Sequence, residues 1–273
     1  MNILGKKVSL QTMDKLTPEN LRDIFVKLQT VELDTVVVGG QAVNLWAYQY
    51  YQNSQQLEQY LPFASEDLDF YGGKIEAVIC QKTLGGKVIL NQDFDPSPNA
   101  GIVLVEHQNK TLRIDFLASV YGLNDSEITG TALTFVGKDQ LENVKLKVLH
   151  PILCLEGKLR CLRGLPQHNR QDLKHTKILI ICLNQFLADL IPNHSSRICL
   201  KLIERILDNG MREDGLSAWY HHQIAIENTI PLEIVEKAED EKWDKFRQIR
   251  LPQIREQLNL KRLHYQEIMN RLR

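Results

Sequence analysis

The pattern of apolar and polar positions predicts short strands and helices in mixed order in the first half of the chain. Apolar residues recur at helical spacing over 17–28, after a threonine and a proline that suit a helix start. Residues 41–51 and 74–84 also have helical composition. Strands are predicted at 34–38, 67–71, 87–90, 102–106, 111–118, 133–136 and 144–149.

From Pro151 onward strand signals disappear and helical periodicity dominates. One apolar stripe is formed by Leu155, Leu159 and Leu162. Helices are predicted at 172–190, 196–207, 216–227, 232–240 and in the terminal segment up to Arg273. The change in pattern predicts an α+β fold with a domain boundary near residue 150, followed by an all-α domain.

Composition excludes several classes of protein. Apolar residues make up 43% of the 273 positions and charged residues 25%, which is ordinary for a globular chain and unlike a disordered or fibrous one. No apolar run approaches the ~20 residues that cross a bilayer, and the first 15 residues lack the features of a signal peptide. We therefore expect a cytoplasmic protein without a membrane partner. The five cysteines are scattered and predict buried free thiols.

Charge is unevenly distributed along the chain. The net charge is −5 over residues 1–150 and +4 over residues 151–273. The basic half contains a cluster near its start, namely Lys158, Arg160, Arg163, His168, Arg170, Lys174, His175 and Lys177. Such a cluster is compatible with a phosphate-rich partner such as the end of a tRNA, and equally with a solvated helix face.

Three aspartates form the strongest candidate for chemistry. Asp67 and Asp69 stand two residues apart in a predicted strand, so the strand period places both carboxylates on one face. A third, Asp115, alternates with Ile114 and Phe116 in another predicted strand. Adjacent carboxylates repel unless a cation lies between them, and Mg²⁺ takes such ligands together with phosphates. A two-metal phosphoryl-transfer site is therefore predicted, with solvated strand faces as the alternative.

A glycine pair precedes these aspartates. Gly39 and Gly40 stand between a buried predicted strand and a predicted helix. Glycine lets the backbone approach a ligand closely, and a helix N-terminus presents free N–H groups to phosphate. Ser65 can add a hydroxyl to the same phosphates. A simple tight turn is the alternative for the glycine pair.

The order of strand, glycine pair, helix, Ser-x-Asp-x-Asp and a later aspartate resembles the nucleotidyltransferase pattern of the DNA polymerase beta superfamily. Within it, 37–45 and 65–70 look like the first motif of the AbiEii-type toxins of bacterial abortive-infection and toxin–antitoxin systems. The resemblance covers about residues 34–180. Two departures are a long interval of 26 residues between Gly40 and Asp67, and Phe63 and Ala64 where an arginine is common.

The resemblance implies a polymerase-beta-like catalytic domain, a mixed sheet with flanking helices, at residues 1–149. It also implies a helical domain at residues 150–273 that contributes to nucleotide or acceptor binding. The implied metal ligands and catalytic residues, for Mg²⁺ or Mn²⁺, are Asp67, Asp69 and Asp115. The implied residues for binding a nucleoside triphosphate are Gly39, Gly40, Ser65, Lys158 and Asp172.

Lys158 and Asp172 are assigned roles only by the resemblance. Lys158 would place a positive charge near the phosphates, and Asp172 would orient Lys158 or contact the base or ribose. A solvated helix lysine beside Arg160 and Arg163 is the alternative for Lys158.

The expected activity is transfer of a nucleoside monophosphate from a nucleoside triphosphate to RNA such as tRNA, to a protein or to a small molecule. The resemblance also implies a toxin with an antitoxin protein as its partner. A catalytically inactive binding or regulatory protein with the same fold is the main alternative. A metal-dependent nuclease is a third option, although the glycine pair has no evident purpose in one.

Overall fold

The computed structural model describes residues 15–92 and 96–272. The N-terminal segment 1–14, on which the expected lack of a signal peptide rests, lies outside the described residues, as does Arg273. Over the described part, the chain is α+β: strands are interspersed with helices up to Val148, and only helices follow from Pro151. This confirms the predicted fold class at the level of a mixed sheet followed by a helical region.

Seven strands form one sheet in the order β3-β4-β5-β2-β1-β7-β6. Their bounds are β1 (Val36–Val38), β2 (Leu68–Tyr71), β3 (Lys87–Leu90), β4 (Asn99–His107), β5 (Lys110–Leu117), β6 (Leu133–Val136) and β7 (Lys145–Val148). The pairs β2–β5 and β1–β7 are parallel, whereas the other neighbours are antiparallel. The sheet is therefore mixed, and each of its seven strands overlaps a predicted range.

Helices connect the strands and make up the rest of the chain. Their bounds are α1 (Arg22–Leu28), α2 (Gly39–Tyr50), α3 (Lys74–Leu84), α4 (Asp125–Thr131), α5 (Pro151–Gly164), α6 (Asp172–Leu190), α7 (Ser196–Met211), α8 (Glu213–His222), α9 (Leu232–Lys237), α10 (Glu241–Lys245) and α11 (Leu251–Arg271). Short 3-10 segments are η1 (Tyr51–Asn53), η2 (Gln55–Tyr60), η3 (Asp139–Leu141), η4 (Ile191–Asn193) and η5 (Ile226–Thr229), and η6 (Phe246–Arg250) is a π-helix. The long interval between Gly40 and Asp67 is thus filled by α2, η1 and η2.

One predicted helix ends early, and one helix was not predicted. The helix expected at 216–227 ends at His222, because Gln223 adopts a left-handed conformation with φ of 57° and closes the helix. The helix α4 was not predicted, although Asn124 caps it by accepting a hydrogen bond from the N–H of Ser126 at 3.0 Å. It is one of the shorter helices, so its periodic signal is weak.

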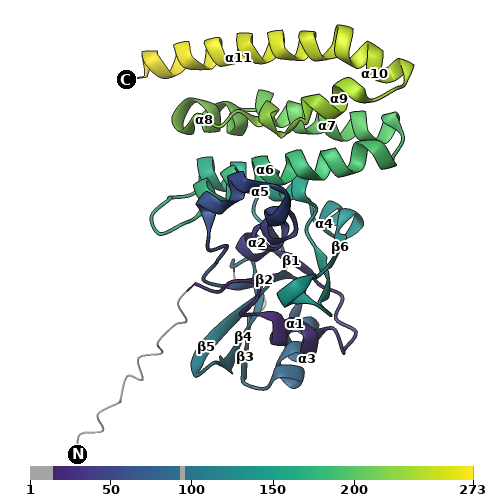
Figure 1. The fold of residues 1–273 in the computed structure, drawn as a ribbon. Coiled ribbons are helices and arrows are strands. Elements are labelled where there is room, and N and C mark those ends of the chain that lie inside the picture. Colours follow the sequence, from purple (N-terminus) through teal and green to yellow (C-terminus); the bar gives the residue numbers. More distant parts are fainter. Residues whose placement is uncertain (1–14, 93–95, 273) are drawn as a thin grey trace, which may run out of the picture.

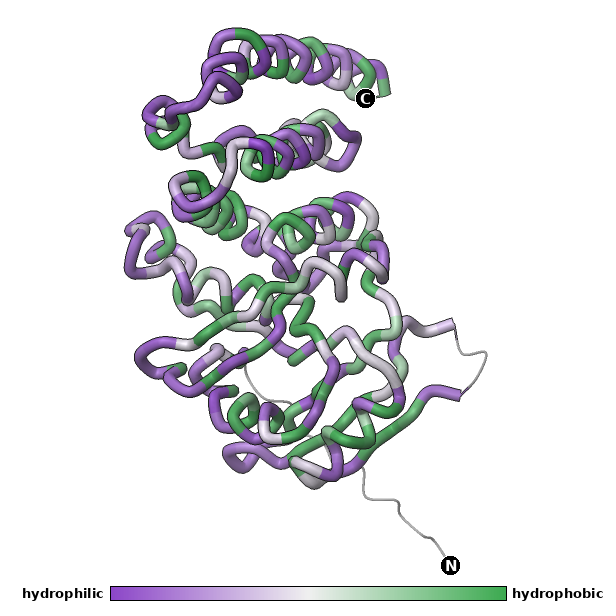
Figure 2. The backbone as a smooth tube through the Cα atoms, turned by 90° about the vertical axis from the view of Figure 1, so that its right-hand side faces the viewer, coloured by the Kyte–Doolittle hydropathy of each residue, from purple (hydrophilic) through white to green (hydrophobic). Residues whose placement is uncertain are grey.

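The apolar core is continuous across the predicted boundary at residue 150. Buried apolar side chains form one cluster that extends from Leu16 beside the sheet to Ile254 in the last helix. Figure 1 shows α2 between the sheet and the helices α5 and α6, with α7 and α8 beyond them and α11 outermost. Figure 2 shows hydrophobic residues gathered in the strands and nearby helices, whereas α11 is mainly hydrophilic. None of the described helices has the length and apolarity needed to cross a membrane.

Candidate functional site

Parallel strands β2 and β5 bring the predicted acidic residues together. In the register of these strands Asp69 lies opposite Asp115. Register partners on neighbouring strands project from the same face of a sheet, so both carboxylates point to one side. Asp67 lies two residues before Asp69 and immediately before β2. Phe70 and Phe116, the next pair in the register, stack with ring centroids 5.5 Å apart and hold the two strands together.

Mutual repulsion among these carboxylates changes their proton affinity. Burial, followed by the negative charges of Asp115 and Asp67, raises the pKa of Asp69 to about 7. Burial and the charge of Asp115 also raise the pKa of Asp67. The nearby positive charges of Lys158 and Arg113 oppose the rise at Asp69 but do not cancel it. The acidic site therefore has less positive charge around it than its carboxylates require.

Asp115 is held by two donors from the protein. Nε of Arg113 lies 2.9 Å from Oδ2 of Asp115, and Nη2 lies 3.0 Å from Oδ1. Nδ2 of Asn99 donates to Oδ1 at 3.1 Å. Within residues 15–92 and 96–272, no group of three or more His, Cys, Asp and Glu side chains is arranged to hold a metal ion. For a three-carboxylate metal site, Asp115 would have to release Arg113.

The glycine pair lies against the acidic residues. Helix α2 begins at Gly39, whose φ of 64° is a backbone conformation that residues other than glycine rarely adopt. A Cβ atom placed on Gly39 would lie 2.1 Å from Oδ2 of Asp69, and one on Gly40 would lie 2.2 Å from Oγ of Ser65. Both glycines thus allow the first turn of α2 to contact the acidic strand and the serine before it.

Lys158 and Asp172 form a buried ion pair between α5 and α6. Nζ of Lys158 lies 2.8 Å from Oδ1 of Asp172, and the two side chains are 13% and 2% exposed. Nε of Arg170 contacts the other carboxylate oxygen at 2.6 Å. Burial raises the pKa of Asp172, but Lys158 and Arg170 outweigh it, so the net shift is downward. Lys158 is therefore not the solvated helix lysine that was the alternative, and its contact with a nucleotide remains a prediction.

One cavity of about 650 Å³ collects many of the predicted residues. Gly39, Gly40, Asp67, Asp69 and Lys158 all line it. The cavity is also lined by residues that were not predicted as part of the site, among them Ser119, Tyr121, Cys161 and Arg170. Ser65, Asp115 and Asp172 are buried and do not line the cavity, although each contacts or neighbours a residue that does.

Three residues near the site were missed, although the sequence contains a signal for each. Arg113 stands two positions before Asp115, so the strand period places it on the same face. Arg170 stands two positions before Asp172, just ahead of α6. His175 follows Asp172 by three positions on α6, which is the spacing of one helical face. It is only 3% exposed, and neither ring nitrogen has a hydrogen-bond partner among the described residues.

The basic cluster of the sequence is not one free surface. Arg163 pairs with Glu213 and Asp214, and Arg160 lies 3.9 Å from Asp214. Lys174 donates to the carbonyl of Pro62 at 2.9 Å. Lys158 and Arg170 both pair with Asp172, and His175 is buried. His168 and Lys177 are exposed, and no ion pair or hydrogen bond of their side chains is found in the described part of the chain. The RNA acceptor remains a prediction that this cluster supports only weakly.

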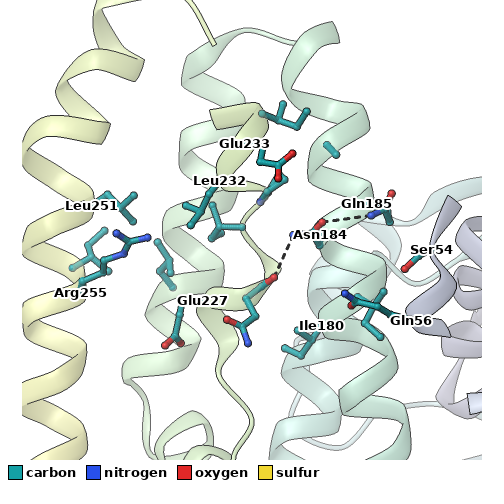
Figure 3. Close-up of a pocket in the computed structure, with 18 of the residues that line it drawn as sticks. Ser54, Gln56, Ile180, Asn184, Gln185, Glu227, Leu232, Glu233, Leu251 and Arg255 are labelled. Carbon is teal, nitrogen blue, oxygen red and sulfur yellow. Dashed lines mark hydrogen bonds between the residues drawn. The ribbon is translucent and has the colours of Figure 1, made fainter. Parts of the chain in front are cut away.

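A second cavity, of about 790 Å³, lies between α6, η5, α9 and α11 (Figure 3). Its walls mix apolar and polar side chains, and Nδ2 of Asn184 donates to the carbonyl of Asn228 at 3.3 Å. Its acid Glu227 is held by Arg262 through two contacts of 2.7 Å. The smaller cavity brings Asp67 and Asp69 together with Lys158 and the glycine pair, so it is the better candidate for chemistry.

Comparison with known proteins adds little. No protein-family model and no curated protein matches the chain. Among solved structures, the crystal structure of JHP933 from Helicobacter pylori matches with 15% sequence identity and a TM-score of 0.34, over 94% of this chain and 97% of that chain. A TM-score this low does not establish a shared fold, so the functional argument depends on the geometry of the site.

Proposed function

We propose that this protein is a metal-dependent nucleotidyltransferase with a polymerase-beta-like catalytic fold. It would transfer a nucleoside monophosphate from a nucleoside triphosphate to an acceptor. The observation that carries the proposal is that Asp69 and Asp115 share one face of the sheet beside the glycine pair that begins α2, with Asp67 lining the same cavity as Asp69. Neither element alone is specific, but their contact is what the chemistry requires.

The donor set suits a hard divalent cation. Carboxylate oxygens are the ligands that Mg²⁺ and Mn²⁺ prefer, and burial together with negative neighbours raises the pKa values of Asp67 and Asp69. Asp67 and Asp69 would hold the metal, and Asp115 would join them on leaving Arg113. Such an ion stabilises the charge that develops on a triphosphate during phosphoryl transfer.

The chain's own residues would bind and orient the triphosphate. The first turn of α2 lies against Asp69 and Ser65, and the N–H groups of a helix N-terminus can donate to phosphate oxygens. Lys158 lines the same cavity and adds a positive charge, while Asp172 and Arg170 fix the position of its ammonium group. Positioning and charge stabilisation make up most of the catalysis in this type of reaction.

A second candidate is a nucleotide-binding or regulatory protein that does not catalyse transfer. The bidentate contact of Arg113 with Asp115 favours it, because the arginine occupies the carboxylate that would complete the metal site. Under this proposal the cavity still binds a triphosphate through Lys158 and α2. A partner protein from a toxin–antitoxin system is compatible with both proposals.

Transfer of label separates the two candidates. Purified protein is incubated with each α-³²P-labelled nucleoside triphosphate and Mg²⁺ or Mn²⁺, with and without total RNA, and label on RNA or protein is measured. We expect transfer by the wild type and none by Asp67→Ala or Asp69→Ala, with circular dichroism unchanged. Unchanged transfer by both variants would overturn the assignment, and RNA cleavage without added triphosphate would favour a nuclease. Triphosphate binding without transfer would support the second candidate.

The acceptor remains open among RNA, protein and small molecule. The exposed members of the basic cluster are few, so binding of a tRNA at this surface is expected to be weak and sensitive to salt. Titration of tRNA at several salt concentrations measures this dependence. Binding that does not change with salt would count against an RNA acceptor held by these residues.

A further inference from the structure

His175 occupies an unusual environment next to the glycine pair. It lies on α6, is 3% exposed, and both ring nitrogens are buried without a partner among the described residues. Burial, followed by the positive charge of Lys158, lowers the pKa of His175 to about 3, so the ring is neutral at physiological pH. A neutral imidazole has one N–H donor and one acceptor nitrogen, and here neither is satisfied.

A buried polar group without a partner destabilises the protein, which makes such groups rare in folded chains. In contrast, the half-buried His150 accepts a hydrogen bond at Nδ1 from the N–H of Ile152 at 3.2 Å, at the start of α5. The buried ring nitrogens of His175 thus indicate a position that can make a hydrogen bond when a neighbouring group reorients.

The surroundings of His175 indicate what kind of partner is missing. A Cβ atom on Gly40 would lie 2.2 Å from Oγ of Ser65 and 3.0 Å from Cε1 of His175, so the hydroxyl and the ring both lie beside the first turn of α2. Cε1 lies between the two ring nitrogens, so rotation about the broad side-chain torsion brings a nitrogen toward the serine. The N-terminus of α2 and Lys158 make this region favourable for an anion.

We propose that His175 is a positioning residue of the triphosphate site, one that acts through Ser65. When a triphosphate binds, a ring N–H of His175 donates to Oγ of Ser65, and the Ser65 hydroxyl donates its own proton to a phosphate oxygen. This inference rests on the proposed binding of a triphosphate, but not on transfer. Hydrogen bonds joined in such a chain strengthen one another, and the hydroxyl is held in the orientation that the phosphate needs.

The test separates this role from a structural one by measuring stability and affinity together. The His175→Leu variant removes both nitrogens and leaves an apolar side chain. We expect the melting temperature of its unliganded form to be unchanged or higher, because no hydrogen bond is lost. Its affinity for Mg²⁺–tripolyphosphate, measured by calorimetry on the full chain, should fall roughly tenfold, the size of one hydrogen bond to a charged group.

Two further variants complete the experiment. In a Ser65→Ala background, His175→Leu should change the affinity by less than about twofold, because the residue through which it acts is gone. His150→Leu is the matched control, and we expect a lower melting temperature with nearly unchanged affinity.

Each other outcome has a defined meaning. A lower melting temperature for His175→Leu, unchanged affinity, or an equal loss of affinity in the Ser65→Ala background would overturn the role of His175 and leave the proposed function standing. Should the wild-type protein bind neither tripolyphosphate nor any nucleoside triphosphate, the proposed function fails, and the role of His175 fails with it.

Discussion

At each aspartate of the site, the immediate neighbours decide how the carboxyl group behaves. Asp115 has Arg113 and Asn99 as donors, whereas Asp69 is buried beside two negative neighbours whose effect positive charges oppose only in part. Residues of the same type, on adjacent strands and in register, therefore differ in their need for a cation. This difference leads to a prediction that can be measured without knowing the acceptor.

The Asp69→Asn variant should be more stable than the wild type in the absence of metal. The pKa of Asp69 is raised to about 7 in the folded protein, so between the unfolded value near 4 and pH 7 the folded state binds more protons. The contribution of Asp69 to the free energy of unfolding is therefore present at pH 4 and is lost as the pH rises through about 7. At pH 8 we expect Asp69→Asn to gain roughly 1–3 kcal/mol in urea denaturation, and much less at pH 5.

Metal and a surface variant serve as controls for this prediction. Adding Mg²⁺ should raise the melting temperature of the wild type but not of Asp69→Asn, because the ion stabilises only the charged form. Asp23→Asn, whose side chain is 75% exposed, should change stability by less than about 0.5 kcal/mol at either pH. An Asp69→Asn variant that is less stable than the wild type at pH 8 would contradict the electrostatic description of the site.

At the scale of elements, the site is assembled from the start of α2, the strands β2 and β5, and the facing helices α5 and α6. The ion pair of Lys158 with Asp172 is the link between the two helices. The two glycines are the link between α2 and the strand. Each link is a contact between residues far apart in sequence, and each can be removed separately.

Removing the charge of Lys158 should destabilise the protein more than removing the whole pair. In Lys158→Met, the buried carboxylate of Asp172 retains only Arg170 as an ionic partner, and we expect a loss of roughly 2–4 kcal/mol. In Lys158→Met with Asp172→Leu, two apolar side chains replace the charges, so the loss should be smaller. Urea denaturation of the three proteins measures this, and a double variant at least as unstable as the single one would argue against the pair.

Side chains at the glycine pair should close the site. Gly39→Ala forces a left-handed residue to carry a Cβ that lies 2.1 Å from Asp69, and we expect a loss of roughly 1–3 kcal/mol. Gly40→Ala pushes on Ser65 and His175, so triphosphate affinity should fall at least tenfold. Gly130→Ala in α4 is the control, because its Cβ meets nothing within 4 Å, and it should be neutral or slightly stabilising. Full triphosphate affinity in Gly40→Ala would show that the triphosphate does not bind at the glycine pair.

For the whole molecule, one ionic network joins the sheet half to the helical half. Arg205 of α7 contacts Glu156 of α5 at 2.7 Å and Glu127 of α4 at 2.8 Å, and Nδ2 of Asn209 donates to the buried Glu156 at 3.0 Å. Because the apolar core is also continuous across residue 150, the two predicted domains share their interior.

Arg205→Met should lower the stability of the entire chain. The 4% exposed side chain of Glu156 would lose its charged partner, and we expect a loss of roughly 2–3 kcal/mol after allowing for the partial exposure of Arg205. Scanning calorimetry should still show a single transition, because the core cluster includes both halves. Two separated transitions in the wild type would instead show that residue 150 divides independent folding units.

Local patterns were enough to predict much of the fold. The bounds of α3, α6, β3 and β6 match those predicted, and a glycine stands directly beside three of them, at the ends of α3, β3 and β6. The end of α8 was missed, because a left-handed glutamine leaves no mark in the periodicity. The short α4 was missed because its seven residues contain too few apolar positions to show a period.

The sequence by itself determined which side chains share a face, because a strand of period two leaves Asp67 and Asp69 together and Arg113 beside Asp115. The tertiary structure decided which faces meet. Pairing of β2 with β5 set Asp69 opposite Asp115, and packing of α6 against α2 brought His175 to Gly40 and Ser65. Strand register and helix packing join residues distant along the chain, and their energies depend on burial and charge that no local pattern contains.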